Sequence, residues 1–210
     1  SYPDNIMAVR LSADQAGKIS FDTNLENLIN GTAYTNTVDG DTITMRDALP
    51  TNGLNVEAQL KVINEGGSLS TGTNGGNPAI TVSGADAVTL IFACGTDYKM
   101  ELPNFRGEDP HKAVTARINA AAKKGYEALK ADHVADHDAL FSRVELGFDE
   151  EIPQIPTDEL IKKYRNMIEN NGGDIPTSAE QRALEIMCYQ FGRYLTIAGS
   201  RDGALPTNLQ

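Results

Sequence analysis

The first hundred residues alternate apolar and polar positions with a period of two, which is the pattern of half-buried β-strands. Asp39-Gly40 tolerates positive φ and predicts a tight hairpin between strands at 32–38 and 41–45. The Gly- and Asn-rich run at 71–78 predicts a loop. The other predicted strands lie at 6–11, 18–25, 56–64, 79–82 and 87–94. The last of these is almost entirely apolar, so we expect a central strand covered on both faces. With no helical pattern between the strands, we expect an antiparallel meander with sandwich-type packing.

Helical periodicity follows the strand region. Asp109 is expected to cap a helix that has Pro110 at its first position. Apolar side chains from Val114 to Leu129 recur on one face. This spacing predicts one long helix that runs towards Phe141.

A second helix is predicted to start at Thr157, which can act as its cap, and to stop at 171–173, which reads Asn-Gly-Gly. Strands followed by helices define an α+β fold. We expect three regions: a β-sandwich segment at 1–107, a helical linker at 108–155 and a further helical region at 156–210.

A third helix is marked by a capping box, which either Thr177 with Glu180 or Ser178 with Gln181 can form. Its residues are apolar almost all round, which is typical of a helix buried among other helices. A Gly- and Pro-containing loop then leads to Gln210. Because such a helix needs neighbours to cover it, we expect the chain to be a piece of a larger protein.

Charge and composition exclude several classes of function. The net charge is 18 − 29 = −11 with no run of basic residues, which disfavours a nucleic-acid partner. No apolar run approaches the ~20 residues of a membrane-spanning helix, and no signal peptide is visible. Cys94 and Cys188 lack a CxxC partner and are expected to be buried free thiols.

Two histidines, His133 and His137, are four residues apart on the predicted long helix. That spacing can place two imidazoles on one metal ion, but the Glu of an HExxH arrangement is absent. Three acidic residues lie beside them: Asp132, Asp136 and Asp138. The alternative is two partly buried histidines that are hydrogen-bonded within the protein, and we favour it. His111 is expected to be an exposed residue of a first helical turn.

Adjacent carboxylates occur at 108–109, 149–151 and 158–159. They lie at helix starts or in a connector, where the helix dipole alone favours acidic residues. No pair among them is predicted to be catalytic, and the Gly-rich turns lack the spacing of phosphate-binding loops.

Three polar residues near the end of the chain have side chains that could bind a sugar. Arg201 could line a sugar pocket or hold its loop through a carboxylate, and we favour the second role. Asn208 and Gln210 can contact sugar hydroxyls, but we expect them to support the loop.

Six segments in order resemble glycoside hydrolase family 95. They are SYPDNIMAVRLSAD (1–14), QLKVINEGGSL (59–69), TDYKMELPNFRGEDPH (96–111), DHVADHDALFSRVELGF (132–148), PTDELIKKY (156–164) and FGRYLTIAGSRDGALPTNLQ (191–210). His137 stands where that family usually has an aromatic residue, and Asp202 where Pro is common.

The resemblance implies an N-terminal β super-sandwich, a helical linker, an (α/α)6 barrel and a C-terminal β domain. By this resemblance 1–105 would be the later part of the β domain and 109–148 the linker helices. The region at 156–210 would be the start of the α/α barrel region, with 191–210 as the first barrel helix and its following loop.

The resemblance also implies an exo-glycosidase that acts chiefly on α-1,2-linked L-fucose, or in some members on α-L-galactose. Such enzymes invert the anomeric carbon with a Glu as general acid and a water activated by Asn residues that an Asp supports. The family places these residues beyond the NLQ segment at 208–210, so no catalytic, substrate-binding or metal residue and no cofactor is assigned to this chain.

The expected function is therefore the scaffold portion of a 1,2-α-L-fucosidase-like enzyme. Its expected partners are the remainder of the parent chain and, through that parent, fucosylated glycans; the cellular location is left open. The alternative is a stand-alone carbohydrate-binding or adhesion module. Exposed aromatic platforms would support that alternative, but Trp is absent and Tyr34, Tyr98 and Phe105 are scattered along the sequence.

Overall fold

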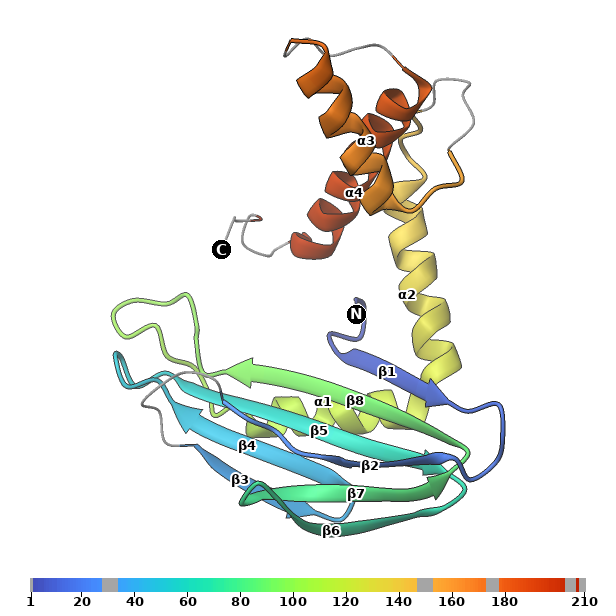
Figure 1. Cartoon of the computed structure of the whole chain (residues 1–210). Coiled ribbons are helices and arrows are strands. Elements are labelled where there is room, and N and C mark those ends of the chain that lie inside the picture. Colours follow the sequence, from blue (N-terminus) through green and yellow to red (C-terminus); the bar gives the residue numbers. More distant parts are fainter. Residues whose placement is uncertain (1, 28–33, 147–152, 173–177, 203–206, 208–210) are drawn as a thin grey trace. The chain divides into compact units, whose positions relative to one another are not determined.

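A computed structural model describes residues 2–27, 34–146, 153–172, 178–202 and 207. Within these ranges the chain forms eight strands and four helices, which confirms the α+β class (Figure 1). The chain divides into two compact units, Ser1–Val134 and Ala135–Gln210, and each is described by itself.

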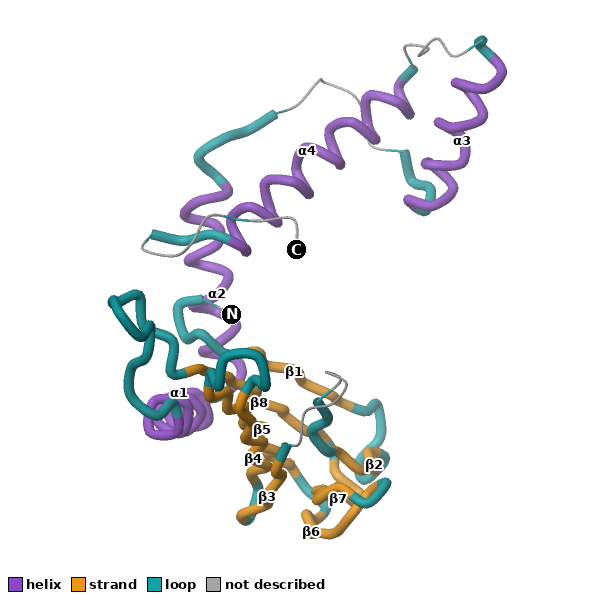
Figure 2. The backbone as a smooth tube through the Cα atoms, turned by 90° about the vertical axis from the view of Figure 1, so that its left-hand side faces the viewer, coloured by secondary structure: helices purple, strands orange, loops and turns teal. Residues whose placement is uncertain are grey.

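The strands of the first unit form two antiparallel sheets. The eight strands are β1 (Met7–Ser12), β2 (Ile19–Thr23), β3 (Thr35–Asp39), β4 (Thr42–Ala48), β5 (Asn55–Glu65), β6 (Ser68–Asn74), β7 (Asn77–Ala85) and β8 (Ala87–Thr96). The large sheet has the order β1-β8-β5-β4-β3 and the small sheet the order β2-β7-β6. The small sheet covers one face of the large sheet and helix α1 (His111–Lys124) covers the other, so the unit has three layers (Figure 2). Sandwich-type packing is thus confirmed.

Two details of the predicted strand region are wrong. The strands do not form a simple meander, because β1 and β2 follow each other in sequence but lie in different sheets. The run at 71–78 is not a loop, since β6 pairs with β7 from Ser68 opposite Ser83 to Asn74 opposite Asn77. Leu69 is the one residue of β6 that is not exposed, so the apolar alternation that reveals the other strands is missing there.

The hairpin predicted at Asp39-Gly40 is present. Strands β3 and β4 pair from Asp39 opposite Thr42 onward, and Gly40 in the turn has a φ of 57°. This conformation is one that glycine adopts without steric cost.

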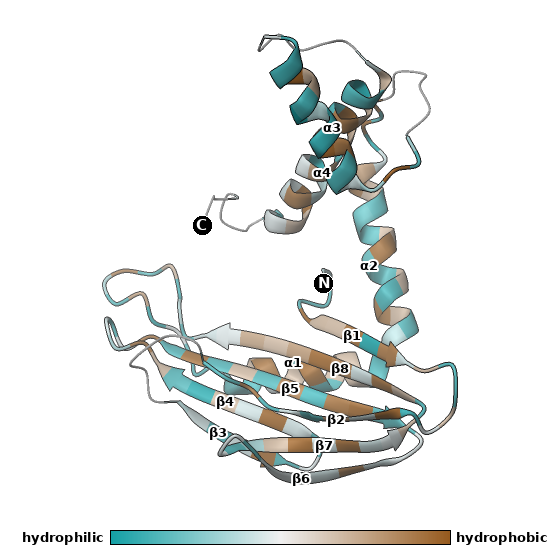
Figure 3. Cartoon of the chain, viewed as in Figure 1, coloured by the Kyte–Doolittle hydropathy of each residue, from teal (hydrophilic) through white to brown (hydrophobic). Residues whose placement is uncertain are grey.

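Aliphatic side chains fill both interfaces of the large sheet, and Figure 3 shows the hydrophobic positions along its central strands. The cluster between the sheets contains Ile43, Leu60, Val62, Ile80, Val82, Ala85 and Val88. The cluster beneath α1 includes Ile6, Ile91, Ala93, Val114, Ile118, Ala121 and Leu129. Strand β8 contributes to both clusters, which confirms the prediction of a central strand covered on both faces.

The large sheet extends beyond the small one at β1. Met7, Val9 and Leu11 are paired with the β8 residues that face the small sheet, and cross-strand partners share a face. These three side chains are nevertheless 60%, 42% and 38% exposed. Cys94 lies on the same face of β8 and is exposed as well. Cys188 is also exposed, so the expected burial is wrong for both thiols, which are free.

Two helices replace the single long helix predicted after the sheets. Gly125 separates α1 from α2 (Tyr126–Phe141) and has φ 82° and ψ 157°, a conformation that side chains rarely permit. The periodicity continues across this position, which is why sequence alone predicted one helix. Asp109 acts as expected of a capping residue, because its Oδ1 accepts a hydrogen bond from the backbone N–H of His111 at 2.8 Å.

The remaining helices are α3 (Thr157–Asn170) and α4 (Ala179–Gly199). Thr157 is the first residue of α3 rather than its cap, and the preceding Pro156 makes no side-chain cap, so that prediction is wrong. Ser178 Oγ accepts a hydrogen bond from the backbone N–H of Gln181 at 3.1 Å, which confirms Ser178 as the cap of α4. The reciprocal bond of a capping box is absent, because Gln181 Oε1 accepts no hydrogen bond from the described residues. Thr177, the cap of the other predicted box, lies outside the described residues.

Helix α4 is not enclosed by the described part of the chain. Its buried residues are Gln181 and Ala183. Four large apolar side chains of α4 are 44% to 61% exposed: Tyr189, Phe191, Tyr194 and Leu195. The surroundings that its composition predicts are therefore not provided by these residues. Across the described ranges, no helix combines the length and apolarity needed to cross a membrane.

Candidate functional site

A carboxylate is buried between β5 and α1. Glu57 has an exposed fraction of 0%, and Gln59, two residues further along the same face of β5, is 2% exposed. Acidic side chains are almost never fully buried unless they are paired. The side chains around Glu57 are therefore a candidate functional site.

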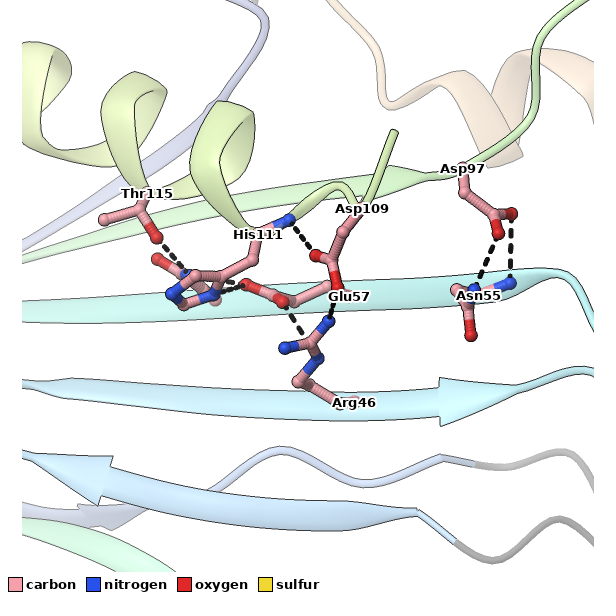
Figure 4. Close-up of polar contacts among 8 residues, drawn as sticks. Arg46, Asn55, Glu57, Asp97, Asp109, His111 and Thr115 are labelled. Carbon is pink, nitrogen blue, oxygen red and sulfur yellow. Dashed lines mark hydrogen bonds and ion pairs between the residues drawn. The ribbon is translucent and has the colours of Figure 1, made fainter. Parts of the chain in front are cut away.

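Side chains from three elements converge on Glu57 (Figure 4). Glu57 Oε1 accepts a hydrogen bond from Gln59 Nε2 at 2.6 Å and lies 2.8 Å from Nδ1 of His111. Arg46 of β4 places Nε 3.2 Å from Glu57 Oε2. Gln59 Nε2 also donates to Thr115 Oγ1 at 2.8 Å. These residues, together with Asp109, are called the Glu57 network below.

Asp109 joins the start of α1 to β4. Its carboxylate forms an ion pair with the Arg46 guanidinium while it caps the helix through His111. The backbone N–H of His111 and the Arg46 guanidinium together lower the pKa of Asp109. The carboxylate pair at 108–109 thus includes a structural residue, as expected.

The geometry of the Glu57 network suits a structural role, in which it holds the start of α1 against β4 and β5, rather than chemistry on a substrate. Both oxygens of Glu57 face donors or a cation from the protein itself. Sequence reasoning missed this carboxylate because most apolar residues of β5 stand at even positions, which places Glu57 on the apparent solvent face. Helix α1 covers that face, and no local pattern reveals it.

A second buried carboxylate, Asp97, fastens the loop after β8. Asp97 is 6% exposed and accepts hydrogen bonds from the backbone N–H and the Nδ2 of Asn55 at 3.1 and 2.6 Å. Its own carbonyl oxygen accepts from the Gly107 N–H at 2.6 Å, and Arg106 Nε lies 3.7 Å from its carboxylate. Both ends of the 97–107 loop are therefore tied to one anchor.

Two aromatic rings stand together on this loop. The centroids of Tyr98 and Phe105 are 6.4 Å apart and their planes differ by 4°. Tyr98 is 50% exposed and Phe105 39%. The expectation that these aromatic residues are merely scattered is wrong, because the loop brings them together.

The two candidate metal-binding histidines contact other parts of the protein. His133 Nδ1 lies 3.3 Å from the carbonyl oxygen of Tyr2. The centroid of the His137 ring lies 5.3 Å from the ring centroid of Phe141 and 5.6 Å from that of Tyr194. Among the described residues, no three His, Cys, Asp or Glu side chains are grouped so that they could hold a metal ion.

Arg201 holds its loop through a carboxylate, as predicted. One guanidinium nitrogen lies 2.6 Å from Asp136 Oδ2, and Nε donates to the Ile197 carbonyl at 2.8 Å. The acidic pair Asp158-Glu159 is engaged by Lys162 on the surface of α3. The candidates at 149–151, Asn208 and Gln210 lie outside the described residues.

An open groove of about 710 Å³ runs between the end of α2 and α4. Leu140, Val144 and Ile197 contribute apolar surface to it, and Arg143 and Arg193 contribute charge. The Arg193 guanidinium lies over the Phe141 ring, 4.2 Å from its centroid. This groove adds further apolar surface to the exposed side of α4.

Comparison with known protein families assigns the class. Residues 125–210 match the model described as the glycosyl hydrolase family 95 catalytic domain, and residues 1–101 match the glycosyl hydrolase family 65 N-terminal domain. The β-sandwich and the helices after Gly125 are thus each similar to a domain of the glycosyl hydrolases.

The chain is also similar to proteins named as α-fucosidases. The chain is 32% identical over its whole length to "Probable alpha-fucosidase A" of Aspergillus niger, of which it covers 26%. It is 27% identical, again over its whole length, to "Alpha-L-fucosidase 2" of Arabidopsis thaliana, of which it covers 27%. The chain thus spans about a quarter of the length of these relatives. These matches confirm the resemblance to glycosyl hydrolase family 95 that its sequence segments indicated.

Proposed function

We propose that this chain is the scaffold portion of an inverting exo-glycosidase that removes terminal α-L-fucosyl, or α-L-galactosyl, residues from glycans. The observation that carries the proposal is the whole-chain similarity to a relative named as an α-fucosidase, of which the chain covers 26%. In this proposal 1–107 is the β-sandwich segment, 108–155 the linker and 156–210 the start of the barrel region.

The scaffold role is supported by three carboxylates of this chain that are bound by other groups of the protein itself. Inverting hydrolysis needs two carboxyl groups about 6.5–9.5 Å apart on opposite sides of a sugar. Glu57 and Asp97 are buried and hydrogen-bonded to the protein, and Asp136 is paired with Arg201. We therefore assign the acid and the water-activating groups to parts of the enzyme outside this chain.

The exposed apolar side of α4 supports the same proposal. Phe191 and Leu195 are 61% and 49% exposed, and the neighbouring groove is largely apolar. Apolar surface of this extent usually marks an interaction site. We assign it to contacts with the remaining helices of the catalytic domain, which makes the rest of the enzyme the chain's main partner.

Hydrolysis assays test the proposal directly. The 210-residue chain and the longer protein that contains it are each incubated with an aryl α-L-fucoside and an aryl α-L-galactoside. The longer protein is expected to release the aglycone, and NMR of the first-formed sugar is expected to show the inverted anomer. The chain alone is expected to show no turnover; turnover by the chain would refute the scaffold role, and a retained anomer would refute inversion.

A further inference from the structure

We propose that the loop Asp97–Gly107, called the aromatic loop below, binds a 6-deoxyhexose through the rings of Tyr98 and Phe105. The fucosyl residue belongs to this class of sugar, and the choice of sugar rests on the proposed function. The site lies in the β unit, apart from any residue to which chemistry has been assigned.

The two rings leave aromatic surface open. Atoms of rings in van der Waals contact lie about 3.5–4.0 Å apart. The centroids here are 6.4 Å apart although the planes differ by 4°, so the rings are parallel but farther apart than two fully stacked rings. Their exposed fractions of 50% and 39% agree with this geometry. Parallel, partly open rings offer a flat apolar surface to the C–H face of a sugar.

The loop is built to hold this arrangement. Its ends are tied to Asp97, which is buried against Asn55, and the Lys99 N–H donates to the Phe105 carbonyl at 3.3 Å. Phe105 has a φ of 52°, in the left-handed region that non-glycine residues adopt at a cost. Such a residue persists only where its surroundings over-determine it, and positions of this kind cluster at ligand sites. A preformed loop also loses little conformational entropy when a ligand binds.

The rest of the loop favours a deoxy sugar. Met100 and Leu102 are 72% and 82% exposed, so this short segment carries four exposed large apolar side chains. Lys99 and Glu101 form an ion pair at 2.8 Å in the same segment and supply a donor and an acceptor for hydroxyl groups. A 6-deoxyhexose combines an apolar methyl group with ring hydroxyls. A hexose with a hydroxymethyl group would set a polar group against the apolar side chains.

Ligand-observed NMR and calorimetry on the whole chain test the proposal. Methyl α-L-fucoside is compared with methyl α-L-galactoside, which differs by a hydroxyl in place of one hydrogen on C6. We expect millimolar binding of the fucoside, as for small ligands, with the strongest saturation transfer at its methyl group. We expect the galactoside to bind about fivefold more weakly.

Two substitutions probe the rings. Tyr98→Ala and Phe105→Asn are each expected to weaken fucoside binding about tenfold. Asn is chosen because it tolerates the left-handed backbone conformation at position 105. Tyr189→Ala and Met7→Ala remove similarly exposed side chains elsewhere and are expected to leave binding unchanged. Circular dichroism confirms that each variant is folded.

Three results would overturn the inference: no saturation transfer from the wild-type chain to the fucoside at about 20 mM fucoside, unchanged binding in both ring variants, or equal affinity for the two sugars. The outcome is separable from the hydrolysis assay. If the longer protein cleaves fucosides but the aromatic loop does not bind them, this inference fails and the proposed function stands. If the loop binds and the longer protein does not cleave, the reverse holds.

Discussion

Removal of the buried carboxylate of Glu57 should loosen α1 from the large sheet. In a Glu57→Ala variant, Gln59 Nε2 loses the acceptor at 2.6 Å, and Arg46 and His111 lose their shared anion. Gln59 is 2% exposed, but it keeps its bond to Thr115. The variant therefore disrupts a network that joins three elements without removing every contact in it.

The size of the lost unfolding free energy depends on how much hydration Arg46 and His111 regain in the variant. Breaking a fully buried ion pair costs about 3–5 kcal/mol, because the remaining charge stays out of water. Here the side chains of Arg46 and His111 are 46% and 53% exposed, so both regain hydration. What remains is the lost hydrogen bonding of Gln59 and a small cavity, for which we expect about 2–3 kcal/mol of lost unfolding free energy.

Urea unfolding followed by circular dichroism measures this loss, and hydrogen exchange locates it. We expect faster exchange of the α1 amides in Glu57→Ala than in the wild-type chain. Glu57→Gln keeps the shape and should lose about 1–2 kcal/mol. The control is Glu65→Ala, at the exposed end of the same strand, which removes a solvent-exposed ion pair with Arg10 and should lower the unfolding midpoint much less. A Glu57→Ala midpoint equal to that control, or unchanged exchange in α1, would refute the fastening role.

Two further predictions concern backbone and charge. Gly67→Ala should destabilise the chain by more than the ~1–2 kcal/mol expected for Gly40→Ala, and urea unfolding measures both losses. Both glycines have positive φ. A Cβ at position 67 would meet backbone atoms at 2.3 Å, whereas no atom lies within 4 Å of a Cβ at position 40. Hydrogen bonds from Lys124 to Asp132 and, second in size, to Asp4 raise the pKa of Lys124 in the folded chain. The stabilisation from these bonds is therefore complete below the unfolded-state pKa of about 10.4. It is lost as pH rises through the higher pKa of the folded state. Melting temperatures between about pH 9 and pH 12 should fall less in Lys124→Gln than in the wild-type chain; equal falls would contradict this assignment.

Local chemistry made several elements predictable from sequence. The Asp39-Gly40 turn and the Ser178 cap each depend on a few neighbouring residues with strong preferences. The central strand β8 was predictable because both of its faces are apolar.

The misses share a different cause, which is tertiary context. Gly125 fits a helical pattern until its φ is known, and Glu57 reads as a solvent-facing residue until α1 is placed over it. The pairing of the Tyr98 and Phe105 rings depends on how a loop closes on Asp97. None of these arrangements has a signature within a short window of sequence, since each is decided by residues distant in the chain.

The unequal widths of the two sheets make the large sheet asymmetric at its edges. Among the described strands, β1 and β3 are the outermost members of that sheet. The solvent-facing row of β3 is Thr35, Thr37 and Asp39, whereas that of β1 is methionine, valine and leucine. Polar and charged rows discourage edge-to-edge association, and apolar rows invite it. Fibrillar or strand-mediated assembly of this chain would therefore grow from the β1 side, and a single lysine placed in that row would be the natural means to block it.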